Sequence, residues 1–235
     1  MAKRQIIEKL TLAQKISITI GGGSLLVAVI GFGMKLSESR AKGPVMPEHL
    51  TVEFLVPQAS GGGGQQTVPF QMVRALAAMQ KILIRPGAKP KGSWLVLGID
   101  ANGRVTDVMQ QGGPAETRLM EEDGALVWWV DANSAVQSVL LVDVPATFQQ
   151  PKVQELRAAI NTIEAKPTVS PGIQLAFSEA GVTRVATGPE GKGEVQPASP
   201  TDTKWADQLA DVLNRYDLDY AGRTFAVKAA ATQPA

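Results

Sequence analysis

The chain has 235 residues, a formal net charge of +1 and no cysteine. The lack of cysteine excludes disulfide bonds, thiol catalysis and zinc–thiolate sites. The 23 basic residues are scattered along the chain rather than gathered into a stripe, so we expect no direct contact with nucleic acid.

An uncharged run over residues 16–34 follows a basic tail. Residues 1–15 carry four basic side chains and one acidic side chain, a net charge of +3 (4 minus 1). A membrane-spanning helix needs about 20 predominantly apolar residues, and basic residues beside it favour the cytoplasmic side. The run therefore predicts a single-pass helix in the bacterial inner membrane, with a cytoplasmic tail and a periplasmic remainder. The side chains expected to anchor it are Ile16, Ile20, Leu25, Leu26, Val29, Ile30 and Phe32.

Three consecutive glycines, Gly21, Gly22 and Gly23, lie within this run. Small residues let membrane helices approach closely, so these glycines are either a helix-packing patch or simply a less hydrophobic part of the anchor. A cleaved signal peptide is the main alternative to a retained anchor. Its apolar core is usually about 7–15 residues and precedes a small-x-small site. The run is longer and no Ala-x-Ala follows it, which favours retention.

The segments after the anchor alternate between polar connections and regular elements. Residues 35–48 contain two prolines and are expected to be a linker. Residues 49–56 mostly alternate apolar and polar side chains, which predicts a strand. Residues 57–66 include four consecutive glycines and predict a flexible loop. Residues 69–83 place apolar side chains at helical spacing after Pro69, which predicts a helix.

Two later segments are expected to be hairpins. Residues 93–109 flank an Asn102-Gly103 pair, which is a strong signal for a tight turn. Residues 125–144 repeat this plan around an Asp-Ala-Asn tripeptide that begins at Asp131. With the strand at 49–56, these segments give about five strands, enough for a small antiparallel sheet or sandwich.

The C-terminal third predicts both helices and strands. Proline at the start of an apolar helical pattern marks a helix at its beginning, and Asp202 is the expected N-cap of a second helix. The elements expected are a helix over 151–164, a hairpin over 172–187 with its turn near 179–181, a flexible loop over 188–201, a helix over 202–217 and a strand over 223–230.

The predicted fold class is therefore α+β. A single-pass N-terminal transmembrane helix precedes a β-rich exported region, a small antiparallel sheet or sandwich with two or three helices. The expected parts are a cytoplasmic tail (1–15), the transmembrane helix (16–34), a linker (35–48), a β-rich periplasmic domain (49–150) and an α+β C-terminal region (151–235). The last two are expected to form one α+β region, with a separate C-terminal module as the alternative.

Candidate catalytic motifs all have simpler interpretations. His49 is the single histidine, and no Gly-x-Ser-x-Gly elbow accompanies it. The glycine-rich segment at 188–193 departs from a phosphate-binding loop at both ends. The segment at 100–104 lacks the later acidic ligands of a calcium loop, and the acidic cluster at 121–123 is expected to be a solvated turn. We therefore expect no enzymatic activity, no cofactor and no metal site.

The adjacent pair Trp128 and Trp129 is the strongest candidate for an interface. Neighbouring residues of a strand face opposite sides, so one tryptophan is expected to enter the core and the other to face outward or meet a partner. An exposed tryptophan is a plausible interface anchor. The alternative is a strand that is buried on both faces.

The order of parts resembles the single-pass inner-membrane subunits of conjugative type IV secretion machines. It is most similar to the TraP-type proteins of IncI-like plasmid transfer systems, which are related in plan to the DotF/IcmG proteins. The basic tail, the glycine-containing anchor and the cysteine-free, strand-rich region from His49 onward carry the resemblance. It implies a non-enzymatic role in an envelope-spanning complex for plasmid transfer. The implied partners are other subunits of that complex and the lipid bilayer, with a homo-oligomer also open.

Other functions share the same plan. A pilus-assembly or other secretion-assembly protein would carry the same anchor. An exported enzyme, or a ligand-binding protein released by cleavage of a signal peptide, would need a pocket with convergent polar groups.

Overall fold

The computed structural model describes residues 50, 52–58, 66–70, 73, 75–186 and 194–228, all within one compact unit (44–235). Within these residues, no helix is both long enough and apolar enough to span a membrane. The predicted tail, anchor and linker lie outside them. The side chains proposed for the anchor and for helix packing therefore lie outside them too: Ile16, Ile20, Gly21, Gly22, Gly23, Leu25, Leu26, Val29, Ile30 and Phe32.

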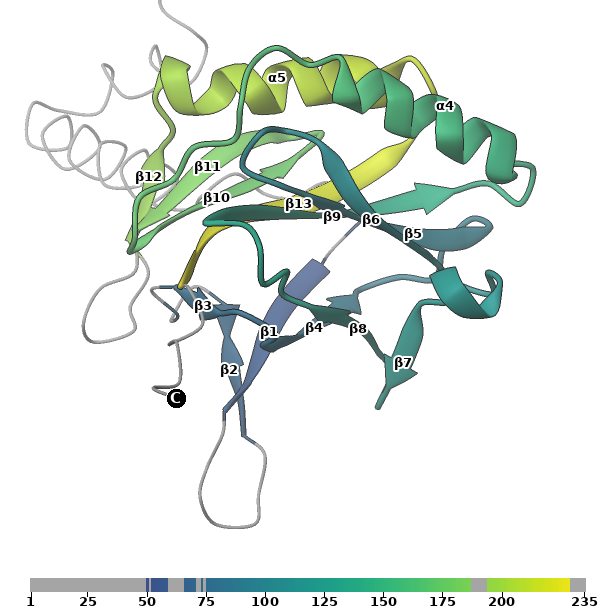
Figure 1. The fold of residues 1–235 in the computed structure, drawn as a ribbon, viewed down its shortest axis with the longest axis horizontal. Coiled ribbons are helices and arrows are strands. Elements are labelled where there is room, and N and C mark those ends of the chain that lie inside the picture. The colour runs from purple at the N-terminus through teal and green to yellow at the C-terminus, as the bar shows by residue number, and fades with distance from the viewer. Residues whose placement is uncertain are drawn as a thin grey trace, which may run out of the picture. The chain divides into compact units, whose positions relative to one another are not determined.

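The described region is α+β and β-rich, with two α-helices, as the sequence predicts (Figure 1). Five strands form a smaller sheet and eight form a larger one. In spatial order the smaller sheet contains β2 (Gln66–Pro69), β1 (Val52–Gln58), β4 (Lys81–Pro86), β8 (Ala125–Trp129) and β7 (Met120–Glu122). The larger sheet contains β12 (Glu194–Pro197), β11 (Gly181–Ala186), β10 (Ile173–Ser178), β13 (Asp219–Lys228), β9 (Val136–Val144), β5 (Ser93–Ile99) and β6 (Val105–Gln110), with β3 (Leu76–Ala77) parallel to the end of β13.

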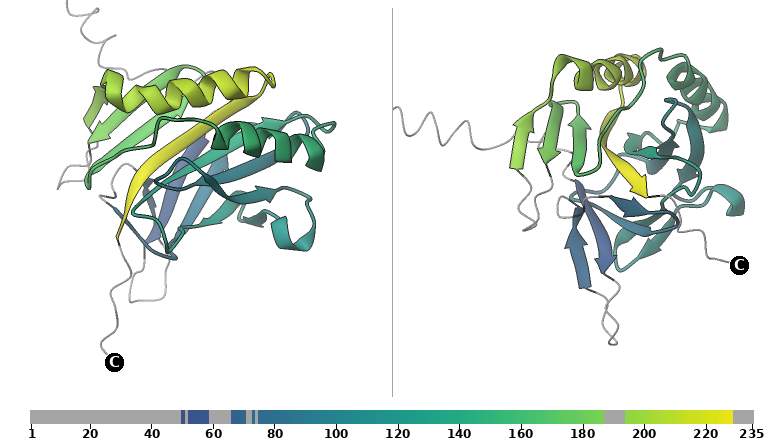
Figure 2. Two further views of the ribbon diagram at one scale, coloured as in Figure 1. Left: turned by 45° about the horizontal axis from the view of Figure 1, so that its top comes forward. Right: turned by 60° about the vertical axis from the view of Figure 1, so that its left-hand side comes forward.

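Three layers result from this arrangement. Helices α4 (Gln150–Asn161) and α5 (Pro200–Asn214) cover one face of the larger sheet, and the smaller sheet lies against its other face (Figures 1 and 2). The central strands are therefore buried on both faces. In β9, Val139 and Leu141 pack between the two sheets, while Leu140 and Val142 pack under the helices. This explains why β9 is a continuous apolar run rather than an alternating one.

The hairpin predicted over 93–109 is confirmed. Strands β5 and β6 pair antiparallel. Gly103 adopts φ +77° in the connecting turn, and its N–H donates to Asp100 O at 3.0 Å. The hairpin predicted over 172–187 is confirmed as well, because Ser178 of β10 pairs with Gly181 of β11 across a two-residue turn.

The helix predicted over 69–83 is wrong. The segment contributes short strands instead, since β4, which begins at Lys81, lies between β1 and β8, and β3 pairs with β13. Ile82 and Ile84 of β4 alternate into the core between the sheets, and Met79 lies in a turn with φ +61°. The spacing of apolar residues fitted a helix, but strand pairing and inter-sheet burial determine the local structure.

The hairpin predicted over 125–144 is also wrong. Strand β8 pairs with β4 and β7 in the smaller sheet, whereas β9 pairs with β5 and β13 in the larger one. The chain turns at Asp131, whose Oδ1 accepts the Asn133 N–H at 2.9 Å, and crosses between the sheets. The local hairpin is instead β7–β8, joined by Asp123 and Gly124 at φ 49° and 74°, as an Asp-Gly turn requires.

Both C-terminal helices form, with small shifts at their ends. Helix α4 begins with Pro151 in its first turn. Helix α5 begins at Pro200, ahead of the predicted N-cap Asp202, and β12 occupies part of the predicted loop 188–201. Beyond α5, Asp217 has φ 53° and Leu218 N–H reaches Leu213 O, the geometry of a Schellman cap.

Strand β13 joins the C-terminal region to the rest of the larger sheet. It pairs with β9 on one side and β10 on the other, so residues from before and after position 150 share one sheet. The hydroxyls of Ser138 and Thr224 lie 2.7 Å apart across β9 and β13, which satisfies both groups inside the core.

Candidate functional site: a groove at the open edge of the two sheets

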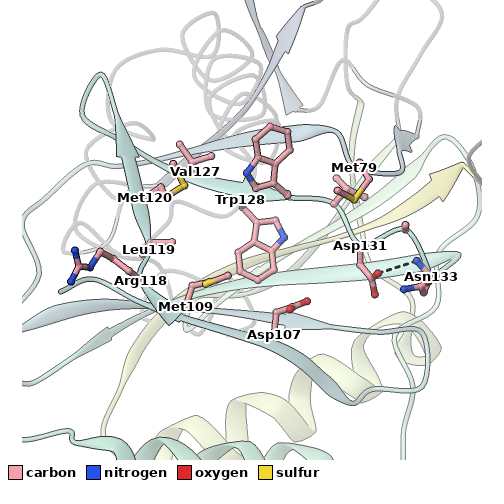
Figure 3. Close-up of a pocket in the computed structure, with 13 residues that line it drawn as sticks. Met79, Asp107, Met109, Arg118, Leu119, Met120, Val127, Trp128, Asp131 and Asn133 are labelled. Atoms are coloured by element: carbon pink, nitrogen blue, oxygen red, sulfur yellow. Dashed lines mark hydrogen bonds between the residues drawn. The ribbon is translucent and has the colours of Figure 1, made fainter. Parts of the chain in front are cut away.

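A groove of about 300 Å³ lies where edge strand β6 of the larger sheet faces the end of β8 in the smaller sheet (Figure 3). Its walls are mainly methionine, tryptophan and branched apolar side chains, with charged groups at the two ends. The residues that line it are Met79, Asp107, Met109, Arg118, Leu119, Met120, Val127, Trp128, Trp129, Val130, Asp131, Ala132 and Asn133.

The two adjacent tryptophans occupy opposite faces of β8, as the sequence predicts. Trp128 is 3% exposed and packs between the sheets, whereas Trp129 is 51% exposed. Strand β7 pairs with β8 only as far as Val127. The groove therefore runs around the part of β8 that lacks a neighbour on the β7 side, and it brings a buried and an exposed indole into one surface.

The Trp128 indole forms the floor of the groove over a glycine. A Cβ atom built on Gly98 of β5 would lie 2.6 Å from Trp128 Cζ2, so only glycine leaves room for the ring. Trp128 Nε1 is buried and has no hydrogen-bond partner in the described structure. A buried N–H without an acceptor is unfavourable.

Two exposed methionines flank the tryptophans. Met79 is 65% exposed and is held at φ +61° by its own backbone, because its N–H donates to Val130 O at 2.9 Å. Met120 is 63% exposed and lies opposite Val127 on the outer face of the smaller sheet. A left-handed conformation costs roughly 1–2 kcal/mol for a residue with a side chain. The turn that contains Met79 therefore keeps this large apolar side chain in solvent at an energetic cost.

The groove is electrically polarised along its length. Arg118 lies at one end, where its Nε donates to Gly113 O at 3.1 Å, and Asp107 and Asp131 lie at the other (Figure 3). A second pocket of about 410 Å³ shares Asp107 and Asp131 and adds Asp100. No group of three or more acidic or histidine side chains in the described residues is placed to hold a metal ion.

The motifs considered for catalysis do not converge on this groove or on one another. Asp100 Oδ1 accepts the N–H groups of Asn102 and Arg104, as expected for a hairpin turn. In the acidic cluster at 121–123, Glu122 forms a salt bridge with Lys81 and Asp123 lies in the hairpin turn. His49 and the segment at 188–193 lie outside the described residues.

Arg223 is a buried cation that inspection of the sequence missed. It lies on β13 and faces the smaller sheet, with its guanidinium carbon 5.8 Å from the centre of the Phe54 ring. Its Nη1 is buried and has no hydrogen-bond partner among the residues that the structure describes, and burial lowers the pKa of the guanidinium to about 10. The sequence feature that points to Arg223 is a single charged residue at an inward-facing position of a long strand.

Asp143 is a second buried ionisable group outside the groove. Both of its carboxylate oxygens accept the Lys91 N–H, at 2.9 and 3.1 Å, and the Lys91 ammonium lies 2.6 Å from Asp219. Burial raises the pKa of the Asp143 carboxyl, whereas the hydrogen bond that the Lys91 ammonium donates to Asp219 raises the pKa of Lys91. These contacts fasten the loop before β5 to the ends of β9 and β13.

Comparison of the chain with protein-family models, with curated proteins and with solved structures found no match. Function must therefore be inferred from the groove and from the sequence pattern.

Proposed function

We propose that the chain is a non-enzymatic inner-membrane component of a conjugative or related type IV secretion apparatus, and that its exported region acts through protein–protein contacts at the groove. The observation that supports this most directly is the clustering of exposed Met79, Met120 and Trp129 around one groove. Large exposed apolar patches mark interaction sites, and aromatic and methionine side chains are enriched in interfaces.

The membrane part of the proposal depends on the sequence alone. The uncharged run at 16–34 has the length of a spanning helix, and the basic tail before it favours a cytoplasmic N-terminus. The linker at 35–48 would then separate the folded region from the bilayer. The resemblance to conjugative inner-membrane subunits rests on this same order of parts.

The membrane assignment can be tested on the full-length chain in a Gram-negative cell. We expect the membrane fraction to contain a protein of uncleaved intact mass, and protease added to spheroplasts to degrade it from outside. A periplasmic protein that lacks about its first 33 residues, as signal-peptide cleavage would produce, would instead support an exported soluble protein.

The role in plasmid transfer can be tested by complementing a donor strain that lacks this chain. We expect Trp129→Ala to reduce transfer at least tenfold while the protein accumulates normally. Glu155→Ala on the exposed side of α4 is the control, because it removes an exposed side chain from another layer. Normal transfer with Trp129→Ala would remove the support that the groove gives to the proposal.

A further inference from the structure

We propose that the groove binds an extended segment of a partner polypeptide, which adds as a strand to the outer edge of β6. The segment would place a lysine or arginine against Asp107 and an apolar side chain, two residues away, against Met109 and Trp128. This inference rests on the proposed function and specifies the chemistry of the partner at the same groove.

The outer edge of β6 has room for a short strand. On its inner side β6 pairs with β5. At one end of the outer side the Val105 backbone is occupied by α4, because Asn161 Oδ1 accepts its N–H at 2.8 Å and Arg157 Nη2 donates to its carbonyl at 3.3 Å. At the other end Gln110 is bridged to Arg118. Between them, no described strand pairs with the outer edge, and such an edge is a template for strand addition.

The side chains of β6 define the spacing of the partner. Asp107 pairs with Gly98 and Met109 pairs with Val96, so both face the space between the sheets where Trp128 lies. They are two residues apart, about 7 Å along a strand. A strand beside β6 places its own side chains about 4.5–5.5 Å from those directly opposite. A partner with an alternating apolar–x–cationic pattern would therefore match both.

The charges at the Asp107 end of the groove favour a cationic side chain in the partner. Asp107 and Asp131 line both the groove and the adjoining pocket, to which Asp100 also contributes. Among the described residues, the Asp107 carboxylate accepts one hydrogen bond, from the Thr106 hydroxyl at 3.2 Å, and it keeps further acceptor capacity. The groove's own cation, Arg118, lies at the opposite end (Figure 3).

The Trp128 indole provides an apolar contact surface for the same segment. Trp128 lines the groove and is 3% exposed. The apolar side chain of the same segment would contact the indole face and Met109.

A synthetic peptide with the sequence Thr-Leu-Thr-Lys-Thr-Leu-Thr-Lys-Thr tests the proposal on the full-length chain in detergent micelles. Fluorescence anisotropy of the labelled peptide measures the dissociation constant. We expect Asp107→Lys to weaken binding at least tenfold. Glu155→Lys, which makes the same charge change on α4, should leave binding within twofold.

Reversing the charge of the peptide separates a direct contact from a misfolded variant. The same peptide with glutamate in place of lysine should bind the unaltered chain at least tenfold more weakly. Asp107→Lys should restore that binding, which loss of folding could not do. Equal binding of both peptides to the unaltered chain would overturn the assignment of Asp107.

Backbone methylation of the peptide tests strand addition itself. In a strand, residues that share a face also direct their N–H groups to the same edge. N-methylation of the alternate residues on one edge should abolish binding, and methylation of the other set should leave it unchanged. If both methylated peptides bind like the parent, or both fail to bind, the segment does not add to β6 as a strand.

Two other outcomes would reject a part of the account. One would reject the polypeptide partner, and the other would reject only the proposed secretion role. If the chain does not bind the peptide but self-associates through a contact that Asp107→Lys disrupts, the occupant of the groove is a second copy of the chain and the proposal is wrong. If the peptide binds as expected but the chain is cleaved and released from the membrane, the groove assignment stands and the proposed secretion role fails.

Discussion

Gly98 of β5 lies directly against the indole of Trp128 from β8, and a Cβ on Gly98 would come within 2.6 Å of Trp128 Cζ2. This contact brings the larger and smaller sheets together at the floor of the groove. It also fixes the indole whose buried Nε1 has no acceptor within the described part of the chain. The position of the Trp128 indole in the groove therefore depends on Gly98, which does not itself line the groove.

Gly98→Ala tests this contact. Overpacking a filled core typically costs about 1–3 kcal/mol, and we expect that loss of unfolding free energy in urea. In a Trp128→Leu background the same substitution should cost less, because the atom that it would meet has been removed. An equal cost in both backgrounds would show that Gly98 and Trp128 are not coupled.

The two tryptophans should differ sharply in their contributions to stability. Trp128 is buried, so Trp128→Ala should cost about 3–5 kcal/mol. Trp129 is exposed, and Trp129→Ala should change stability by no more than about 0.5 kcal/mol. Thermal unfolding of both variants checks this. A large loss of stability with Trp129→Ala would mean that this side chain stabilises the fold rather than contacts a partner.

Met79→Gly should stabilise the folded region by up to about 1 kcal/mol, because glycine adopts φ +61° without steric cost. Met120→Gly is the control, because Met120 is similarly exposed but lies in a strand where glycine is unfavourable. Urea unfolding measures both. A stabilised Met79→Gly that no longer supports plasmid transfer would indicate strain retained for contact with a partner.

Removing the buried charge at Arg223 should also stabilise the fold. Burial lowers the guanidinium pKa to about 10, a shift equivalent to about 3 kcal/mol against the charged form. Contact with the Phe54 ring offsets part of this. We expect Arg223→Met to raise the unfolding free energy, and Arg85→Met, at an exposed position of β4, to change it little. Loss of stability with Arg223→Met would mean that the guanidinium is favourably solvated.

The Arg223 penalty has a defined pH dependence. Above about pH 10 the folded state loses this proton before the unfolded state does, so the unfolded state binds more protons and this group makes stability rise with pH there. Below pH 10 both states are protonated and the penalty is constant. The advantage of Arg223→Met over the unaltered chain should therefore be the same at pH 7 and pH 9, as paired urea titrations can show.

Asp143 should make stability fall as pH rises through the acidic range. Its pKa is raised in the folded state, so the folded protein holds this proton at pH values where the unfolded chain has lost it. Asp143→Asn removes the titration but keeps an oxygen that can accept the Lys91 N–H. The unfolding free energy of this variant minus that of the unaltered chain should therefore be larger at pH 7 than at pH 3.5. The reverse order would contradict a raised pKa.

Local signals in the sequence predicted the elements that local chemistry determines. Asn102-Gly103 marked the β5–β6 turn, and Pro151 marked the start of α4. The predictions failed at 69–83 and 125–144, because strands from those segments pair with partners far along the chain. The Asp123-Gly124 pair is a hairpin signal of the same kind, and it marks the β7–β8 turn, although the acidic cluster at 121–123 by itself predicts only a solvated turn.

The groove could be predicted only in part. The adjacent tryptophans indicated one inward and one outward indole on a strand, and this is what the structure contains. The contributions of Met79, Asp107 and Met109 could not be predicted, because the fold brings them together from separate strands and turns. Sheet order, which decides which edges are open, depends on pairings such as β9–β13 that no local pattern reveals.

The most direct test of the account is site-specific photo-crosslinking from position 129 of the full-length chain, in cells that carry the transfer apparatus. We predict a discrete adduct whose cross-linked segment is extended, apolar and basic. Asp107→Lys should remove this adduct, and the same cross-linker at position 155 should not form it. No adduct from position 129, or the same adducts from both positions, would contradict docking at the groove.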